Sequence, residues 1–150
     1  MKIQIDQSSK IEYTSKNTVI AFSNGRQKSL LIKASDKRKL EEIFREIKRP
    51  EIFVYKTFAV LVYLLIRADL KDIQEIIIDQ EYQGKEPIIK DFLLQIIRKN
   101  HKNAVGKEEI FFSCIGKKSR AHQKALQTFQ GKIKPDLVVG FKNVIEFLFK

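Results

Sequence analysis

The chain has 150 residues, of which 43% are hydrophobic, so it can bury a core and has the size of a single domain, residues 1–150. Lysine and arginine number 29 against 18 aspartate and glutamate, which gives a net charge of +11. This charge indicates either a polyanionic partner, nucleic acid first and an anionic membrane surface second, or solubility alone.

Cysteine usage and hydropathy indicate the compartment. Cys114 is the one cysteine, which rules out a disulfide within the chain and favours a reducing compartment. Residues 1–6 lack the apolar core of a signal peptide, and the most apolar run, residues 52–66, is short for a membrane span and contains Lys56. We therefore expect a cytoplasmic protein, with residues 52–66 forming a buried helix and no membrane partner.

The first third of the chain has the pattern of a β-meander. The predicted strands span residues 2–6, 18–22 and 27–33. Residues 11–13 can add a further pairing to the first strand. Asn24 and Gly25 tolerate the positive φ angles of a tight hairpin turn, so they predict a hairpin between the second and third strands.

Two helices are predicted next. Apolar residues at helical spacing predict a helix over residues 37–48, which Ser35 or Asp36 can cap. Pro50 then suits the first turn of a second helix, residues 51–68. This second helix is apolar almost all round, so it should be the most buried.

The remaining elements alternate between strand and helix. An aliphatic run that ends at Asp79 has the pattern of a fully buried central strand. It is followed by a helix over 87–99, a strand over 110–115, a helix over 121–129, a strand over 137–139, and a short helix or strand over 144–149. This order predicts an α/β fold with a mixed sheet of about five strands, the antiparallel meander plus parallel strands, and helices on both faces.

Asp6 and Asp79 each stand at the end of a predicted strand. Catalytic groups of α/β sheets gather beyond the carboxyl ends of the strands. If the two strands are neighbours, the carboxylates meet, and their repulsion is relieved by a divalent cation, which prefers hard oxygen ligands. Taken singly, Asp79 also suits a cap or turn, and Asp6 a turn.

Three segments resemble the ribonuclease H-like superfamily. Asp6-Gln7-Ser8 is similar to its Asp-x-Ser segment after the first strand, Asp79-Gln80-Glu81-Tyr82 to its Asp-x-x-Tyr segment after the fourth, and Ile115-Gly116-Lys117-Lys118 to the end of its fifth strand. The order of elements over residues 2–130 is also similar. In several branches the last helix brings an Asp or His ligand, and His122 lies in its first turn.

The resemblance implies hydrolysis of nucleic-acid phosphodiesters with two divalent cations, Mg²⁺ or Mn²⁺, as in ribonucleases H, junction resolvases, transposases and Argonaute-type slicers. The catalytic residues that it implies are Asp6, Glu51, Asp79 and His122, with Asp6, Asp79 and Glu51 as metal ligands. The superfamily takes a glutamate from the helix before the central strand, and Glu51 opens that helix.

The glutamate ligand is the one member of this set whose identity stays open, because other glutamates are candidates beside Glu51. Glu41 and Glu42 lie on the extra helix over residues 37–48, which the minimal fold lacks. Glu81 is a ligand, a base or a solvated loop carboxylate. The last helix has no acidic residue after His122, so an inactive member of the superfamily also fits.

A basic cluster follows the predicted strand over 110–115. Its members are Lys117, Lys118, Arg120 and Lys124. It opens a helix, whose amino terminus attracts phosphate, so we expect it to bind the nucleic-acid backbone on the same sheet edge as Asp79. Tyr82 either stacks on a base or sugar or packs in the fold, and His101 is expected to be solvated.

Three other readings remain. The main one is a basic nucleic-acid-binding module without catalysis. The second is a restriction-endonuclease-like site built from Asp136 and Glu146, although the lysine of that pattern is replaced by Leu148. A membrane-surface protein is the third. DNA and RNA are not distinguished, and a homodimer is expected only if the substrate is a two-fold junction.

Overall fold

The computed structural model describes residues 1–102 and 104–149. The strands are β1 (Lys2–Ser8), β2 (Thr18–Ser23), β3 (Lys28–Ile32), β4 (Glu75–Asp79), β5 (Ile110–Ser113) and β6 (Leu137–Val139). The α-helices are α1 (Ala34–Glu46), α2 (Phe53–Ile66), α3 (Glu86–Asn100), α4 (Arg120–Phe129) and α5 (Phe141–Leu148).

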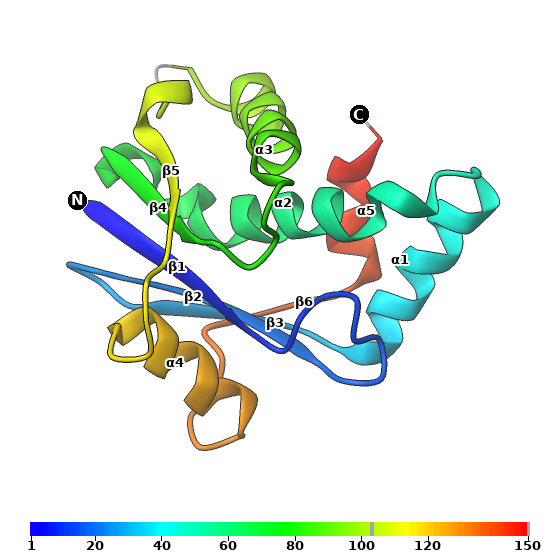
Figure 1. Ribbon diagram of the computed structural model, residues 1–150, viewed down its shortest axis with the longest axis horizontal. Helices are drawn as coiled ribbons and strands as arrows, with labels where there is room; N and C mark the ends of the chain where they lie inside the picture. The colour runs from blue at the N-terminus through cyan, green and yellow to red at the C-terminus, as the bar shows by residue number, and fades with distance from the viewer. Residues whose placement is uncertain (103, 150) are drawn as a thin grey trace.

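The strands form one mixed sheet in the order β5-β4-β1-β2-β3-β6 (Figure 1). β1, β2 and β3 pair antiparallel, whereas β4 runs parallel to β1, β5 parallel to β4, and β6 parallel to β3. The predicted α/β class is confirmed, and β6 brings the sheet to six strands rather than about five.

The hairpin between β2 and β3 forms where the sequence predicts it. Asn24 and Gly25 have φ angles of 105° and 90°, the left-handed region that a tight turn of this kind requires. The expected pairing of residues 11–13 with β1 is wrong. These residues lie in the loop between β1 and β2, and Ile11 reaches the main core from that loop.

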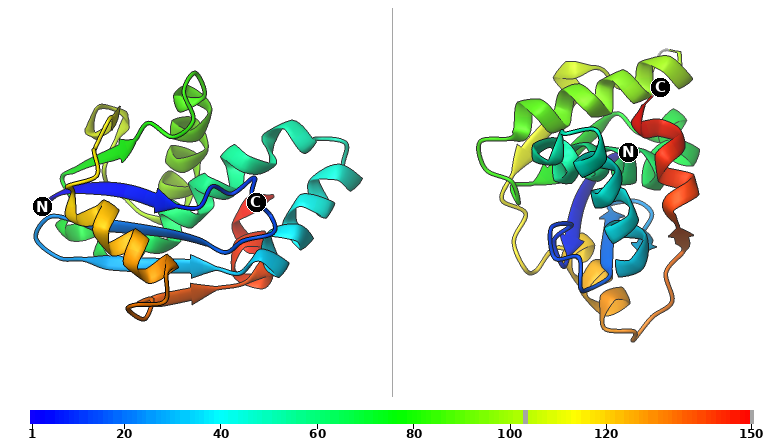
Figure 2. Two further views of the ribbon diagram at one scale, coloured as in Figure 1. Left: turned by 60° about the horizontal axis from the view of Figure 1, so that its bottom comes forward. Right: turned by 90° about the vertical axis from the view of Figure 1, so that its right-hand side faces the viewer.

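The helices cover the two faces of the sheet unequally (Figures 1 and 2). Helix α4 lies on one face and packs against β1, β2 and β3. Helices α2, α3 and α5 lie on the other, and α1 packs against α2 and α5. We call these the α4 face and the α2 face.

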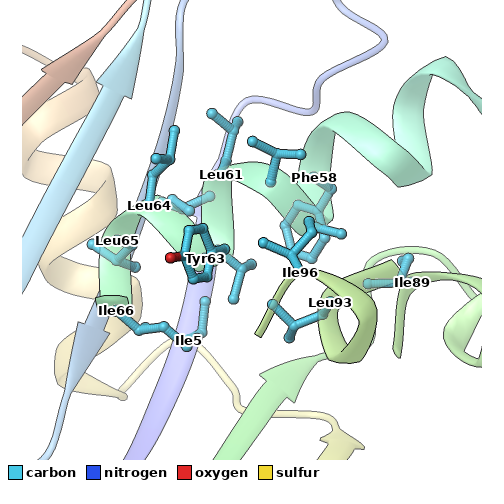
Figure 3. Packing of buried hydrophobic residues seen from close by; sticks show 14 of the residues in the cluster. Ile5, Phe58, Leu61, Tyr63, Leu64, Leu65, Ile66, Ile89, Leu93 and Ile96 are labelled. Carbon is cyan, nitrogen blue, oxygen red and sulfur yellow. The ribbon is translucent and has the colours of Figure 1, made fainter. Parts of the chain in front are cut away.

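The α2 face holds the main core, and α2 is its centre (Figure 3). Eleven of the residues of α2 are buried, as its sequence predicts for a helix that is apolar nearly all round. Leu61 is fully buried there. No helix within residues 1–102 and 104–149 is long and apolar enough to cross a membrane.

The helices begin or end one to three residues from their predicted bounds, and the last predicted element is a helix, α5, that begins at Phe141 rather than at residue 144. Helix α1 begins at Ala34 with Lys33 at its N-cap, and Asp36 instead accepts a hydrogen bond from the backbone N–H of Phe141, 2.9 Å away, at the start of α5. Helix α2 begins at Phe53 because Pro50–Ile52 form a separate 3₁₀ turn. The later start of α2 decides the position of Glu51.

Candidate metal centre at the ends of β1 and β4

Asp6 and Asp79 lie side by side because β1 and β4 are parallel neighbours. Ile5 pairs with Ile78 in the register, so the next residue of each strand is an aspartate. Both aspartates lie toward the carboxyl ends of their strands, where α/β folds place ligands. Two residues 73 positions apart in the sequence therefore meet as predicted.

Glu81 is the third carboxylate of the centre. Asp6, Asp79 and Glu81 each offer a ligand oxygen, and these oxygens all lie within 4.8 Å of one another. Asp6 is buried, and the other two are half-buried. Glu81 lies two residues past the end of β4, in a turn in which its own backbone N–H donates to the carbonyl of Asp79 at 2.9 Å. Three hard oxygen donors thus converge on one point, which suits a divalent cation.

Glu51, the predicted third ligand, is not brought to this centre. It sits in the 3₁₀ turn between α1 and α2, exposed to solvent, and pairs with the Arg49 guanidinium at 2.9 Å. A backbone hydrogen bond, and after it the bond with Arg49, hold the pKa of Glu51 below its usual range. The prediction is corrected because Pro50 diverts the chain before α2 starts, so Glu51 is not on the inward side of that helix.

Backbone and side-chain hydrogen bonds fix both aspartates. One oxygen of Asp6 accepts from the Gln7 N–H at 2.8 Å, and the other contacts Nδ1 of His122 at 2.8 Å. Oδ1 of Asp79 accepts from the Ile115 N–H at 2.8 Å. Gly116, with φ of 85°, follows in a conformation that favours glycine, and there the chain turns from β5 toward α4.

The three carboxylates perturb one another. Burial raises the pKa of Glu81 to about 7, and a hydrogen bond with the Asp79 side chain and the charges of Asp79 and Asp6 act in the same direction. Burial also raises the pKa of Asp6, against the lowering effect of its bonds with His122 and Gln7. A cation in their midst would reverse both effects, because it favours the ionised carboxylates.

His122 joins the centre from α4, as predicted. It lies in the first turn of that helix, whose N-cap residue Ser119 accepts a hydrogen bond from the Ala121 N–H at 3.1 Å. Since Nδ1 faces Asp6, Nε2 is the nitrogen left for a ligand or substrate. The side chain is 27% exposed, so it is accessible from solvent.

The four residues of the predicted basic cluster have different surroundings. Lys117, Lys118 and Arg120 are exposed at the turn into α4. Lys124 is different, because its ammonium lies 3.4 Å from the Asp136 carboxylate and the side chain is 18% exposed. Lys124 therefore joins α4 to the segment before β6, and we remove it from the candidate phosphate-binding set.

Tyr82 supports the centre from inside the fold. Its ring makes edge contacts with Tyr55 and Phe58 of α2, and the residue is 9% exposed. Its hydroxyl accepts from Nε2 of Gln7 at 3.1 Å and from the Ile11 N–H at 3.3 Å. Tyr82 is thus packed rather than free to stack on a base, and it links the segments that carry Asp6 and Glu81.

Lys37 is a residue that sequence reasoning missed. It lies in the run Lys37-Arg38-Lys39, which has the pattern of a solvated face, yet it is fully buried. Its ammonium donates to the Tyr13 carbonyl and the Thr18 hydroxyl, both at 2.8 Å, and so anchors the loop after β1. Burial lowers the pKa of Lys37 to about 8. The spacing of Lys37, Leu40 and Phe44 puts all three on the buried side of α1, so the helical pattern is the signal that identifies this lysine.

The structure also gives the positions of His101 and of Asp136 and Glu146, the pair considered for a restriction-endonuclease-like site. His101 is half-buried rather than solvated, and its Nε2 lies 2.9 Å from the Tyr63 hydroxyl. Asp136 accepts from the Ser29 N–H at 2.8 Å beside β6, whereas Glu146 lies on α5, across the sheet from α4. The pair therefore does not form the restriction-endonuclease-like site.

A comparison with known protein families, with curated proteins and with solved structures finds no match for this chain.

Proposed function

We propose that this protein is a metal-dependent phosphodiester hydrolase that acts on nucleic acid. The observation that carries the proposal is the convergence of Asp6, Asp79 and Glu81 within 4.8 Å at the carboxyl ends of two parallel strands, with His122 beside them. The arrangement of neighbouring β1 and β4, with the antiparallel β2 and β3 beyond β1, also supports the resemblance to the ribonuclease H-like superfamily.

The donor set fits Mg²⁺ or Mn²⁺. Asp6, Asp79 and Glu81 would hold the cation, since hard cations prefer carboxylate oxygens and each of the three presents one to the same point. When bound, such ions acidify the attacking water and stabilise the leaving oxygen of a phosphodiester. Two half-buried ligands leave the centre open to a substrate on its solvent side.

The chain's own groups orient this centre. The Gln7 and Ile115 N–H groups hold one oxygen each of Asp6 and Asp79, which leaves their remaining lone pairs for a cation. The Asp6–His122 bond fixes the imidazole, so that Nε2 is presented to a phosphate or a leaving oxygen. Glu81, whose pKa is raised to about 7 without a cation, would be held ionised as a ligand once the cation is bound.

Charge favours nucleic acid as the substrate. The chain as a whole carries a net charge of +11 although its candidate centre is acidic. The exposed Lys117, Lys118 and Arg120 lie in the segment that connects β5 to α4. This segment also contains Ile115, whose N–H donates to Asp79. Backbone phosphates attracted by these cations would be brought to the carboxylates and their metal.

The test is a cleavage assay with labelled single strands, duplexes, RNA–DNA hybrids and four-way junctions, in Mg²⁺ and in Mn²⁺. Wild type runs beside Asp6→Asn and Asp79→Asn, with Asp91→Asn on the exposed side of α3 as the matched control. We expect each site variant to lose roughly 10²–10³-fold in rate, since several kcal/mol of charge stabilisation is removed. The control should cleave as wild type does.

Binding without metal-dependent cleavage of any of these substrates would overturn the hydrolase and leave the non-catalytic nucleic-acid-binding module. Equal rates for wild type and both site variants would place the chemistry elsewhere in the protein.

A further inference from the structure

Helix α4 does not cover the part of the α4 face formed by β4 and β5. Two apolar residues there, Ile77 and Phe111, form what we call the apolar row, beside the candidate metal centre. Gln4 of β1 pairs with Ile77 of β4, and Ile77 pairs with Phe111 of β5. Paired residues of neighbouring strands point to the same face of a sheet. Gln4 points to the α4 face, because its Oε1 accepts a hydrogen bond from the hydroxyl of Ser119, the N-cap of α4, at 3.2 Å.

Burial agrees with this assignment. Ile76, Ile78 and Ile110, the sequence neighbours of Ile77 and Phe111, are buried in the main core on the α2 face. Ile77 is half-buried and Phe111 is 47% exposed, as expected of the opposite side of the same strands. A phenyl ring on an edge strand is thus presented to solvent.

This row lies close to the carboxylates. Asp79 pairs with Ser113, and Asp6 stands beside Asp79, so the acidic row is two residues farther along the same strands on the same face. Two residues of strand span roughly 7 Å. Phe111 and the centre are therefore separated by a short distance along one continuous surface, on the scale of a nucleotide.

Cations border this surface. The segment after β5 passes Ile115, bonded to Asp79, and reaches Ser119, bonded to Gln4. Lys117 and Lys118 lie between these two anchors, and Arg120 lines a hollow of about 310 Å³ with Gln4 and Ser23. An exposed aromatic ring beside cations is the arrangement with which proteins hold single-stranded nucleic acid, by stacking a base and neutralising its phosphates.

We infer that Phe111 and Ile77 form a stacking platform for an unpaired nucleotide, and that the proposed hydrolase therefore takes single-stranded nucleic acid, or an unpaired segment of it, as its substrate. Within a duplex each base face is covered by its neighbours, so a ring on the sheet can stack only on a base that is splayed out. The inference rests on the proposed function for its nucleic-acid partner, and it adds the strand type and the contact.

Fluorescence provides a direct test, because the chain contains no tryptophan. The Phe111→Trp variant places a single indole on the platform, and Val138→Trp places one on β6 at the opposite edge of the sheet, where Val138 is 59% exposed. Both are titrated with short single-stranded DNA and RNA in Ca²⁺, which takes the same oxygen ligands. We expect quenching of the indole in Phe111→Trp and none in Val138→Trp.

Affinity is measured in parallel with labelled strands. Phe111→Ala should bind single strands roughly tenfold more weakly than wild type, while Phe111→Tyr and Val138→Ala bind as wild type does. Binding of a long blunt duplex should change little in Phe111→Ala, because all of its base pairs except the two at its ends are covered on both faces.

The outcomes separate the two proposals. If wild type binds single strands but Phe111→Ala binds them equally, or the indole is not quenched, the platform is overturned and the proposed function stands. Binding of duplex only also overturns the platform alone. If wild type binds no nucleic acid, both proposals fail together.

Discussion

The two faces of the sheet are built in different ways. The α2 face is closed by three helices over one large apolar core, which extends from Ile3 to Leu148. The α4 face has one helix, a small cluster of Val19, Ala21 and Ala125, and beside it the acidic centre and the open apolar row. The contrast indicates that the α2 face supplies most of the stability, which allows the α4 face to keep buried carboxylates that oppose folding.

The largest expected effect breaks the closed face. Leu61→Ala should lower the free energy of unfolding by about 2–5 kcal/mol, because Leu61 is fully buried at the centre of α2. Ala125→Gly in α4 should cost about 1–2 kcal/mol, the helix-propensity difference plus one buried methyl group. Urea denaturation of both variants measures the contrast, and equal losses would show that the two faces share the stability.

Glu81→Gln tests the cost of the acidic centre. The pKa of Glu81 rises from 4.5 to about 7 on folding, so the folded state binds the proton more tightly and loses stability as the pH rises from 4.5 to 7. Without divalent cations, Glu81→Gln should therefore be more stable than wild type at pH 8, by about 1–2 kcal/mol after discounting for solvent screening. At pH 4 the difference should vanish.

Mg²⁺ or Mn²⁺ should reverse this order at pH 8, because only the wild type keeps the full ligand set. Thermal unfolding of wild type and Glu81→Gln, with and without the cation, measures which of the two proteins is more stable in each condition. If Glu81→Gln is less stable than wild type at pH 8 without cations, the ionised Glu81 carboxylate does not destabilise the folded protein, contrary to our expectation.

Tyr82→Phe should have the smallest effect, since it weakens the link between the segments that carry Asp6 and Glu81 and removes no ligand. The phenol oxygen serves Gln7 and the Ile11 N–H, and its loss should cost about 1 kcal/mol of stability. Affinity for Mn²⁺ should fall roughly tenfold, as for other groups that orient ligands. Tyr13→Phe, at a residue 53% exposed, is the control, and equal affinities in the two variants would remove Tyr82 from the site.

Periodicity was sufficient to predict most of the fold. Alternation gave the meander, helical spacing gave α1 and α3, and the uniformly apolar run gave the buried α2. The aspartates at two strand ends could be paired because parallel neighbours align their carboxyl ends. The loop over residues 11–13 was misread because a buried apolar residue, Ile11, looks the same in a loop as in a strand.

The rest of the site depends on tertiary geometry. Glu81 follows β4 by two residues, and only the turn after Asp79 brings its carboxylate back to the centre. The helix before the central strand is expected to carry a ligand, which points to Glu51, yet the turn at Pro50 removes Glu51 from the site. Lys37 bonds Thr18 of β2 and Lys124 pairs with Asp136 before β6, contacts between different elements that composition does not reveal.

The central claim is that the convergent carboxylates hold a divalent cation. The most direct measurement is a titration with Mn²⁺, followed by the electron paramagnetic resonance of the free ion, on wild type, Asp79→Asn and Glu75→Gln. Glu75 lies in the same strand but pairs with Lys2 at 3.9 Å. We expect wild type and Glu75→Gln to bind Mn²⁺ alike and Asp79→Asn to bind it at least roughly tenfold more weakly. Equal binding by all three, or none by wild type, would contradict it.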